Sequence, residues 1–180
     1  MNVFVAGARV VTILDAVVQE RLNNIFNKNY TVLVGDAIGV DFSVQKYFAH
    51  LKYQNVLVYA SNGKARNNAG GWEVRSIEVL SRSRGFDYYA VKDKAMADDA
   101  DYGFMIWNGE SKGTFGNIVN LLKQDKKSIV YLTINSNFYN IDTFDDFHEL
   151  VNICGQPVKK LFSKLDIATV PSMLQQVSLF

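Results

Sequence analysis

The segment at residues 32–41, VLVGDAIGVD, places the strongest constraint on how this chain folds. Three aliphatic residues run into two glycines, Gly35 and Gly39, which bracket Asp36, and Asp41 follows where a helix would begin. A buried strand, a glycine turn and a helix start in this order make one strand–helix unit of a parallel sheet. Because such a turn points backbone N–H groups into the crevice above the sheet, we expect an anion such as phosphate to bind there.

Strand-like and helix-like runs alternate along most of the chain. Short apolar runs that predict strands lie at residues 3–6, 32–34, 56–59, 102–107 and 128–133. Runs with the apolar spacing of a helix lie between them, at about residues 14–26, 44–51, 72–80, 92–101 and 115–122. This alternation predicts an α/β protein with three layers, built on a mostly parallel five-stranded sheet.

The chain changes character after residue 134. Thr143 and Asp146 resemble a capping box before a helix, as Thr12 and Asp15 do earlier in the chain, and Pro157 opens a further helix. We therefore divide the chain into an α/β ligand-binding domain at residues 1–134 and a helical C-terminal extension with a terminal tail at residues 135–180.

Charge and cysteine content exclude several classes of protein. Lys and Arg number 19 against 18 Asp and Glu, so the net charge of +1 argues against a general nucleic-acid-binding surface. Cys154 stands alone, so no intrachain disulfide can form, and His50 and His148 have no partners at metal-ligand spacing. The chain has no apolar run of membrane-spanning length. We expect a cytoplasmic protein without a membrane partner, a metal or a cofactor.

Three glycine turns follow predicted strands, at residues 7–9, 35–39 and 108–114. In a doubly wound sheet the carboxyl ends of the strands converge on one crevice, so these turns should meet there. The third turn lacks the Gly-Lys-Ser/Thr ending of a Walker A loop, and the first does not continue as Gly-x-Gly-x-x-Gly. Hydrolysis of nucleoside triphosphates and dinucleotide binding are therefore disfavoured.

Several side chains near these turns could hold a phosphate. Arg9 and Arg66 could each donate two N–H groups, although each could equally be a solvated surface arginine. Lys92 and Lys94 could face the crevice or lie at a solvated helix end, and Trp107 could stack on a base or belong to the core. The expected ligand-binding set is Gly7, Arg9, Gly35, Gly39, Arg66, Lys94, Asn108, Gly109, Ser111, Gly113 and Thr114.

Four blocks of this sequence together resemble the SLOG superfamily of Rossmann-like proteins. They are VAGAR at 5–9, GDAIGVD at 35–41, KDKAM at 92–96 and WNGESKGT at 107–114. That superfamily includes the cytokinin-activating LOG phosphoribohydrolases and the DNA-processing protein A fold, and the resemblance spans residues 2–132. It implies a Rossmann-like fold and a nucleotide-like small-molecule ligand with its phosphate near Gly113 and Thr114. Because members often pair, it also implies a homo-oligomer.

One departure from the LOG pattern concerns catalysis. LOG-type hydrolases carry an acid just after their glycine-threonine turn, whereas this chain has Phe115, Gly116 and Asn117. If the chain still cleaves the N-glycosidic bond of a nucleoside monophosphate, a carboxylate must polarise water or stabilise the cationic sugar. The candidates are Asp36, Asp41 and Glu110. A helix cap is the simpler interpretation of Asp41, and Asp36 could instead bond its own turn.

Two further hypotheses about the function therefore remain. The protein could be a nucleotide sensor without catalytic activity, or a binding protein of DNA metabolism. The last residues, QVSLF at 176–180, are similar to the peptide by which many bacterial replication and repair proteins dock on the sliding clamp. In that case Gln176, Leu179 and Phe180 would bind the partner. The alternative is that the tail folds back on its own domain.

Overall fold

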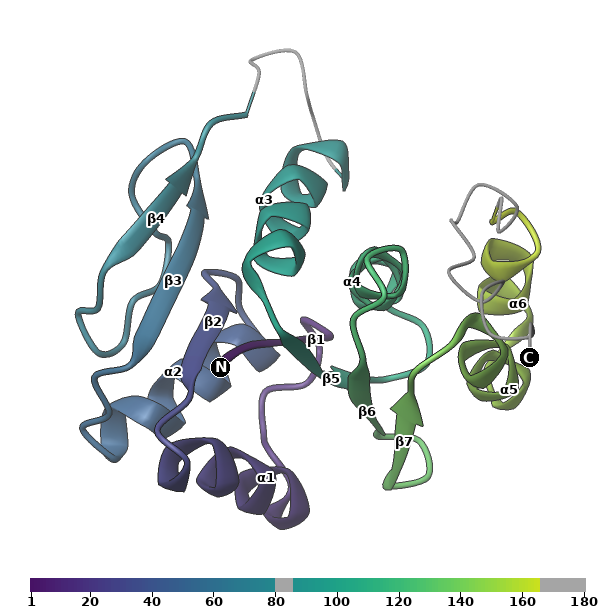
Figure 1. Cartoon of the computed structure of the whole chain (residues 1–180), viewed down its shortest axis with the longest axis horizontal. Coiled ribbons are helices and arrows are strands. Elements are labelled where there is room, and N and C mark those ends of the chain that lie inside the picture. The colour runs from purple at the N-terminus through teal and green to yellow at the C-terminus, as the bar shows by residue number, and fades with distance from the viewer. Residues whose placement is uncertain (80–85, 166–180) are drawn as a thin grey trace, which may run out of the picture.

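A computed structural model describes residues 1–79 and 86–165 of the chain. Its centre is a seven-stranded sheet (Figure 1). In spatial order the strands are β4 (Val74–Ile77), β3 (Val56–Ser61), β2 (Thr31–Gly35), β1 (Asn2–Gly7), β5 (Tyr102–Trp107), β6 (Ser128–Leu132) and β7 (Asn137–Ile141). All neighbours pair in parallel except β6 and β7, which are antiparallel. The predicted mostly parallel three-layer fold is confirmed, but the predicted count of five strands was wrong.

The first additional strand is β4, which replaces a predicted helix at residues 72–80. Val74 pairs with Val58 of β3, and Ile77 pairs with Ser61. The apolar spacing around Trp72 suited a helix, but β3 offers an unpaired edge whose backbone groups this segment satisfies. Backbone pairing with β3 therefore outweighed the weak helical spacing of this segment.

The second additional strand is β7, within the segment expected to be helical. A turn at residues 133–136 returns the chain antiparallel to β6 and brings Phe138 opposite Tyr131. The two rings pack with centroids 5.0 Å apart. Cross-strand aromatic pairs of this kind stabilise an edge hairpin, which explains why a polar-aromatic run became a strand.

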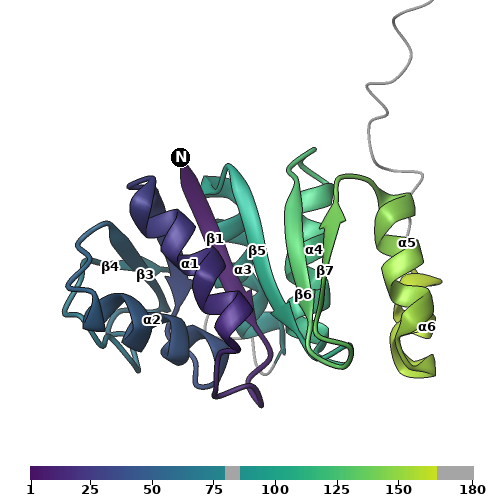
Figure 2. The same ribbon diagram turned by 90° about the horizontal axis from the view of Figure 1, so that it is seen from below.

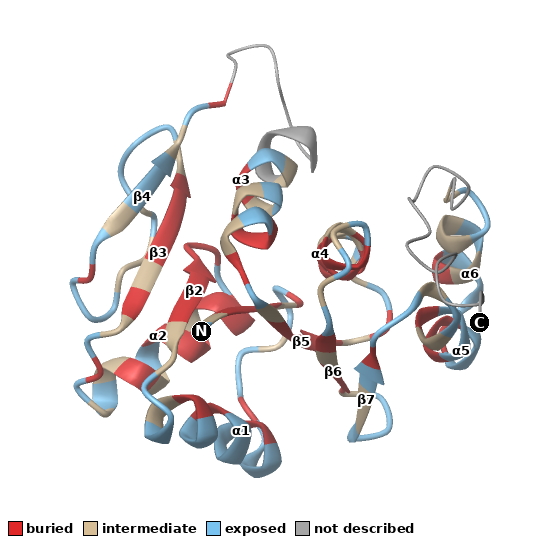
Figure 3. Ribbon diagram, viewed as in Figure 1, coloured by how far each residue is buried: buried red, intermediate tan, exposed pale blue. Residues whose placement is uncertain are grey.

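Helices cover both faces of the sheet. Helices α1 (Ala16–Asn27) and α2 (Val40–His50) lie on one face, and α3 (Phe86–Asp99) and α4 (Lys112–Leu122) lie on the other (Figure 2). The central strands are buried from both sides, as the red segments in Figure 3 show. Burial on two faces explains why these strands are almost continuously apolar.

The C-terminal helices α5 (Phe144–Ile153) and α6 (Gln156–Phe162) join the hydrophobic core on the α4 side. The Phe147 ring lies 5.1 Å from that of Phe115. The capping box of α5 is confirmed, because the Asp146 N–H donates to Thr143 Oγ1 at 3.1 Å and the Thr143 N–H donates to Asp146 Oδ2 at 2.8 Å.

The earlier capping pair, predicted from Thr12 and Asp15, was wrong. Asp15 is the N-cap residue of α1, but its side chain makes no capping hydrogen bond. Its carboxylate instead accepts a hydrogen bond from the hydroxyl of Tyr131 on β6, so Asp15 bonds to a distant strand and not to its own helix.

In the part of the chain that is described, no helix has the length and apolar character needed to cross a bilayer.

Candidate functional site

A cavity of about 620 Å³ opens at the carboxyl ends of β1 and β5. The strand order runs outward in opposite directions from these two strands, which makes this the switch point where open α/β sheets bind ligands. All three predicted glycine turns contribute to its wall. The lining includes Gly7, Ala8, Arg9, Ala37, Asp41, Asn108, Glu110, Ser111, Gly113, Thr114 and Asn117, together with Ala90 and Asp93 of α3.

The turn between β5 and α4 is held in shape by its own side chains. Asn108 Oδ1 accepts hydrogen bonds from the N–H groups of Glu110 and Ser111, at 3.2 and 2.9 Å. Gly109, between Asn108 and Glu110, has φ of 72°, a left-handed conformation that glycine adopts without strain. Ser111 is the N-cap of α4, and its Oγ accepts from the Thr114 N–H at 3.3 Å. The N-terminus of α4 is thereby fixed against the cavity.

Trp107 closes β5 and belongs to the core, since none of its surface is exposed. Its indole N–H donates to the Ser111 carbonyl at 3.1 Å, which ties the turn to the strand. The tryptophan therefore supports the site from behind and has no free face for a base.

Asn117 lies one turn further along α4 and was not among the expected binding residues. It is 5% exposed and lines the cavity, and its side-chain amide makes no hydrogen bond with another described residue. Buried polar groups normally have partners. The free amide can therefore donate to or accept from a bound molecule, although it cannot transfer a proton as a carboxylic acid would.

Asp36 and Arg66 are bound to each other, and neither lines the cavity. Arg66 donates from Nε and Nη2 to the two carboxylate oxygens of Asp36, at 2.9 and 2.6 Å, and its backbone N–H adds a third bond at 3.1 Å. Burial by itself would raise the pKa of Asp36, but these bonds and the charge of Lys92 outweigh it and lower the pKa. Asp36 is thus an ionised support for the loop that carries Arg66.

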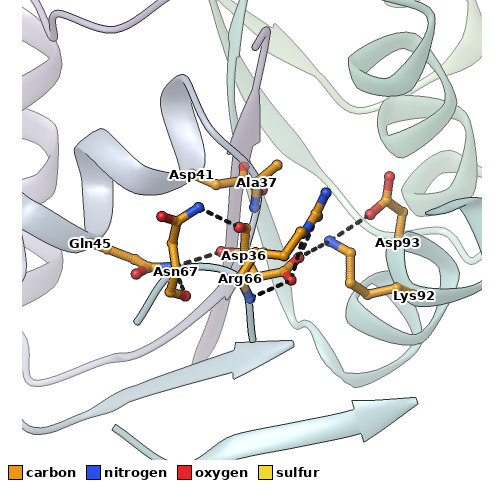
Figure 4. A network of polar contacts seen from close by, with 9 residues as sticks. Asp36, Ala37, Asp41, Gln45, Arg66, Asn67, Lys92 and Asp93 are labelled. Carbon is orange, nitrogen blue, oxygen red and sulfur yellow. Dashed lines mark hydrogen bonds and ion pairs between the residues drawn. The ribbon is translucent and has the colours of Figure 1, made fainter. Parts of the chain in front are cut away.

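That loop, at residues 62–71, is tied to the β2–α2 turn by amide side chains (Figure 4). Gln45 donates to the Gly35 carbonyl at 2.8 Å and accepts from the Ala69 N–H at 3.0 Å. Asn67 donates to the Asp36 carbonyl at 2.8 Å. Arg66 was expected to hold a phosphate, but Arg66 and Asn67 are both bound to Asp36 in the turn below.

Of Lys92 and Lys94, the two lysines of α3 considered from the sequence, Lys92 is the buried one, and it lies behind the cavity wall without lining the cavity itself. The Lys92 side chain is 3% exposed, and its Nζ lies 3.1 Å from Asp93 Oδ1 and 4.0 Å from Asp36 Oδ1. Burial alone would lower the pKa of Lys92, but Asp93, Asp41 and Asp36 raise it, so the amine stays charged. Lys94 is largely exposed, pairs with Asp98 at 2.7 Å and does not line the cavity.

Asp41 lies in the first turn of α2 and faces the cavity, with 7% of its surface exposed. Gly39 is the N-cap residue, so Asp41 is not the cap itself, but it is an acidic residue of the first helical turn, which was the other interpretation of its position. The Asp41 carboxylate accepts instead from the Ala37 N–H at 3.3 Å. Burial raises its pKa to about 6, although the nearby positive charge of Lys92 opposes the change.

Two expected binding glycines serve close packing within the protein. A Cβ added to Gly35 would lie 2.3 Å from Asp41 Oδ2 and 2.6 Å from Lys92 Nζ. The carboxylate and the ammonium group therefore share the space above Gly35. Gly39 has φ of 80°, and a Cβ there would meet the Arg9 carbonyl oxygen at 2.3 Å. Neither glycine lines the cavity, whereas Gly113 does.

Comparison with known proteins identifies a similar fold but does not assign the chain to a family. No family model matches the sequence, and no curated protein matches it. A solved structure of DNA processing protein A from Helicobacter pylori, studied for its single-stranded DNA binding, has a similar fold with a TM-score of 0.57. The match covers 91% of this chain and 79% of that chain at 12% sequence identity, so it shows a shared Rossmann-like architecture alone.

Proposed function

We propose that the cavity binds a nucleotide or a nucleotide-derived phosphate compound, with the phosphate at the N-terminus of α4. The main support for this proposal is the hydrogen bonding of the backbone N–H groups in the first turn of α4. Asn108 accepts from the Ser111 N–H and Ser111 accepts from the Thr114 N–H, which leaves the N–H groups of Lys112 and Gly113 without a partner in the described part of the chain. Free N–H groups at a helix N-terminus favour an anion.

Two other properties of the cavity support a nucleotide-sized ligand. Its volume of about 620 Å³ falls in the usual range for small-molecule sites. A Cβ on Gly113 would meet no protein atom closer than Ser111 Oγ at 3.9 Å, so open space lies directly over the helix end. The SLOG resemblance of the sequence points to the same class of ligand.

Thermal unfolding with and without nucleoside monophosphates tests this proposal. A ligand that binds only the folded protein stabilises it by about 2.7 kcal/mol at a hundredfold excess over Kd. We expect nucleoside monophosphates to raise Tm and the matching nucleosides, which lack phosphate, to raise it far less. Equal shifts for both would show that the phosphate site is wrongly assigned.

A matched pair of cap variants locates the phosphate. Ser111→Ala removes the α4 cap beside the cavity, and Thr143→Ala removes the α5 cap outside it; each should cost about 1 kcal/mol of stability. We expect Ser111→Ala, but not Thr143→Ala, to change nucleotide affinity in isothermal titration, because Ser111→Ala alters the turn at the α4 N-terminus and frees the Thr114 N–H. Equal affinities of the two variants would place the phosphate elsewhere.

Hydrolysis of the N-glycosidic bond is a second candidate function, and the environment of Asp41 favours it. A carboxyl group whose pKa is about 6 in a cavity wall can exchange protons near neutral pH, as a general acid or base must. Released base, measured by chromatography, should appear with the wild type and be absent with Asp41→Asn. Release that survives in Asp41→Asn and disappears in Glu110→Gln would assign the proton transfer to Glu110.

A role in DNA metabolism is the third candidate, and the fold shared with a single-stranded DNA-binding protein favours it. Fluorescence anisotropy with a labelled single-stranded oligonucleotide tests it, and the measured affinity should fall as the salt concentration is raised if phosphate contacts contribute to binding.

The clamp-like tail at residues 176–180 lies outside the described residues. Its docking is tested by comparing binding of the full chain and of a chain lacking residues 176–180 to a purified sliding clamp.

A further inference from the structure

The two walls of the cavity differ in their chemistry. Because β1 lies between β2 and β5 in the sheet, the turn after β2 and the turn after β5 stand on opposite sides of the loop after β1. The β5 side presents the N-terminus of α4 with Thr114 and Asn117. The other side presents the carboxylates of Asp41 and Asp93. Glu110 is exposed at the rim.

The carboxylates of the second wall are held in place by a buried cation. The Lys92 ammonium group lies 3.1 Å from Asp93 Oδ1, and it shares the space above Gly35 with Asp41 Oδ2. Asp36 and Arg66 complete the charged groups behind this wall (Figure 4). Three carboxylates (Asp36, Asp41 and Asp93) against two cations (Lys92 and Arg66) leave one net negative charge here, so this wall disfavours a phosphate and suits hydrogen-bond donors.

The rest of the lining offers few groups that could recognise a base. Apart from Val10, the apolar lining residues are alanines, Ala6, Ala8, Ala37 and Ala90, and none of the described lining residues is aromatic. A cavity that recognised a base by stacking would present an aromatic face. The groups that can discriminate between ligands are therefore the anion site on one wall, the hydrogen-bond acceptors on the other, and the Arg9 guanidinium in the loop between them.

We propose that Asp41 and Asp93 accept hydrogen bonds from the hydroxyl groups of a sugar whose phosphate lies at the α4 N-terminus, so that the cavity selects ribose phosphates over deoxyribose phosphates. This inference rests on the proposed phosphate site and adds the class of ligand. A ribose 5-phosphate unit carries an anion at one end and a pair of hydroxyl donors at the other. Inorganic phosphate can use only one wall, and a 2′-deoxy sugar loses one of the donors.

Isothermal titration at pH 7.5 with three probes tests the inference: inorganic phosphate, adenosine 5′-monophosphate and its 2′-deoxy counterpart. A hydrogen bond to a charged group predicts that the ribonucleotide binds about tenfold to a hundredfold more tightly than the deoxynucleotide. Equal affinities for the two nucleotides would overturn the sugar site and leave the phosphate site standing. Absence of binding by every probe would overturn the proposed function itself and the inference with it.

Variants on the two walls separate the two assignments. Asp41→Asn and Asp93→Asn keep the size of each side chain, and each should reduce the preference for ribose while affinity for inorganic phosphate stays within a fewfold. Thr114→Val on the other wall should weaken all three probes and leave the preference unchanged. A ribose preference that survives both acid substitutions would refute the role of these carboxylates. Circular dichroism confirms that each variant is folded.

Discussion

Replacing the buried Asp41 by asparagine should make the protein more stable at neutral pH. The pKa of this carboxyl rises from 3.8 to about 6 because burial disfavours its charged form. Each unit of such a shift corresponds to about 1.4 kcal/mol, so ionised Asp41 costs the folded state about 3 kcal/mol. Its 7% exposure leaves little solvent to screen this cost.

The pH dependence gives the prediction its sign. The folded protein holds the Asp41 proton more tightly than the unfolded chain, so the penalty is complete above pH 6 and disappears as the pH falls toward 3.8. Asp41→Asn has no such penalty. Its stability relative to the wild type should therefore be greatest above pH 6 and decline between these two values. Lys92 loses one neighbouring carboxylate in the variant but keeps Asp93 and Asp36, which reduces the gain without reversing it.

Urea unfolding of both proteins across this pH range measures the effect. Asp125→Asn is the matched control, because Asp125 is exposed and its positive φ of 53° suits asparagine as well as aspartate. The control should follow the wild type at every pH. A stability difference between Asp41→Asn and the wild type that is the same at pH 8 and pH 4 would refute the claim that Asp41 ionises at a cost.

Three further predictions concern the supports of the site and the cap of α5. Asp36→Asn should destabilise the protein by about 1–3 kcal/mol and speed proteolysis at residues 62–71, because Arg66 loses a charged partner; unchanged proteolysis would show that other bonds hold the loop. Gly35→Ala should destabilise the fold by about 1–3 kcal/mol in urea unfolding, since its methyl group meets Asp41 and Lys92 at 2.3 and 2.6 Å, and a neutral result would mean that these side chains move freely. Thr143→Ala should cost about 1 kcal/mol in the same assay and Thr12→Ala almost nothing, because Thr143 caps α5 whereas Thr12 does not cap α1; equal losses would contradict the capping assignments.

The central fold and the position of the cavity were predictable from the sequence. Apolar runs followed by glycines mark strands that end in tight turns, as at Gly7 and Gly35, and the alternation with helices implies a parallel sheet. Parallel strands bring their carboxyl ends to one edge, so the convergence of the three turns follows from local pattern and topology together. The capping box at Thr143 was equally visible, because its partner Asp146 lies only three residues away.

The edges of the sheet and the partners of the charged residues were decided by tertiary structure. β4 and β7 exist because neighbouring strands offer unpaired backbone groups, which no local pattern reveals. Lys92 and Lys94 look alike in sequence, but they point to different sides of α3, and only Lys92 shares a face with buried Met96, four residues on. The four-residue spacing to Met96 could have indicated that Lys92 is buried. The pairing of Asp36 with Arg66 could not have been predicted, because 30 positions of sequence separate the two residues.

The amino-acid sequence by itself thus determined the strand–helix units and the turns that end them, because these depend on residues close together in the chain. Only the folded structure decided which carboxylates face the cavity, which lie beside a buried cation, and which helix N-terminus lines the cavity. Those properties depend on distance and burial between segments that the sheet brings together, and burial is what changes the chemistry of a charged group.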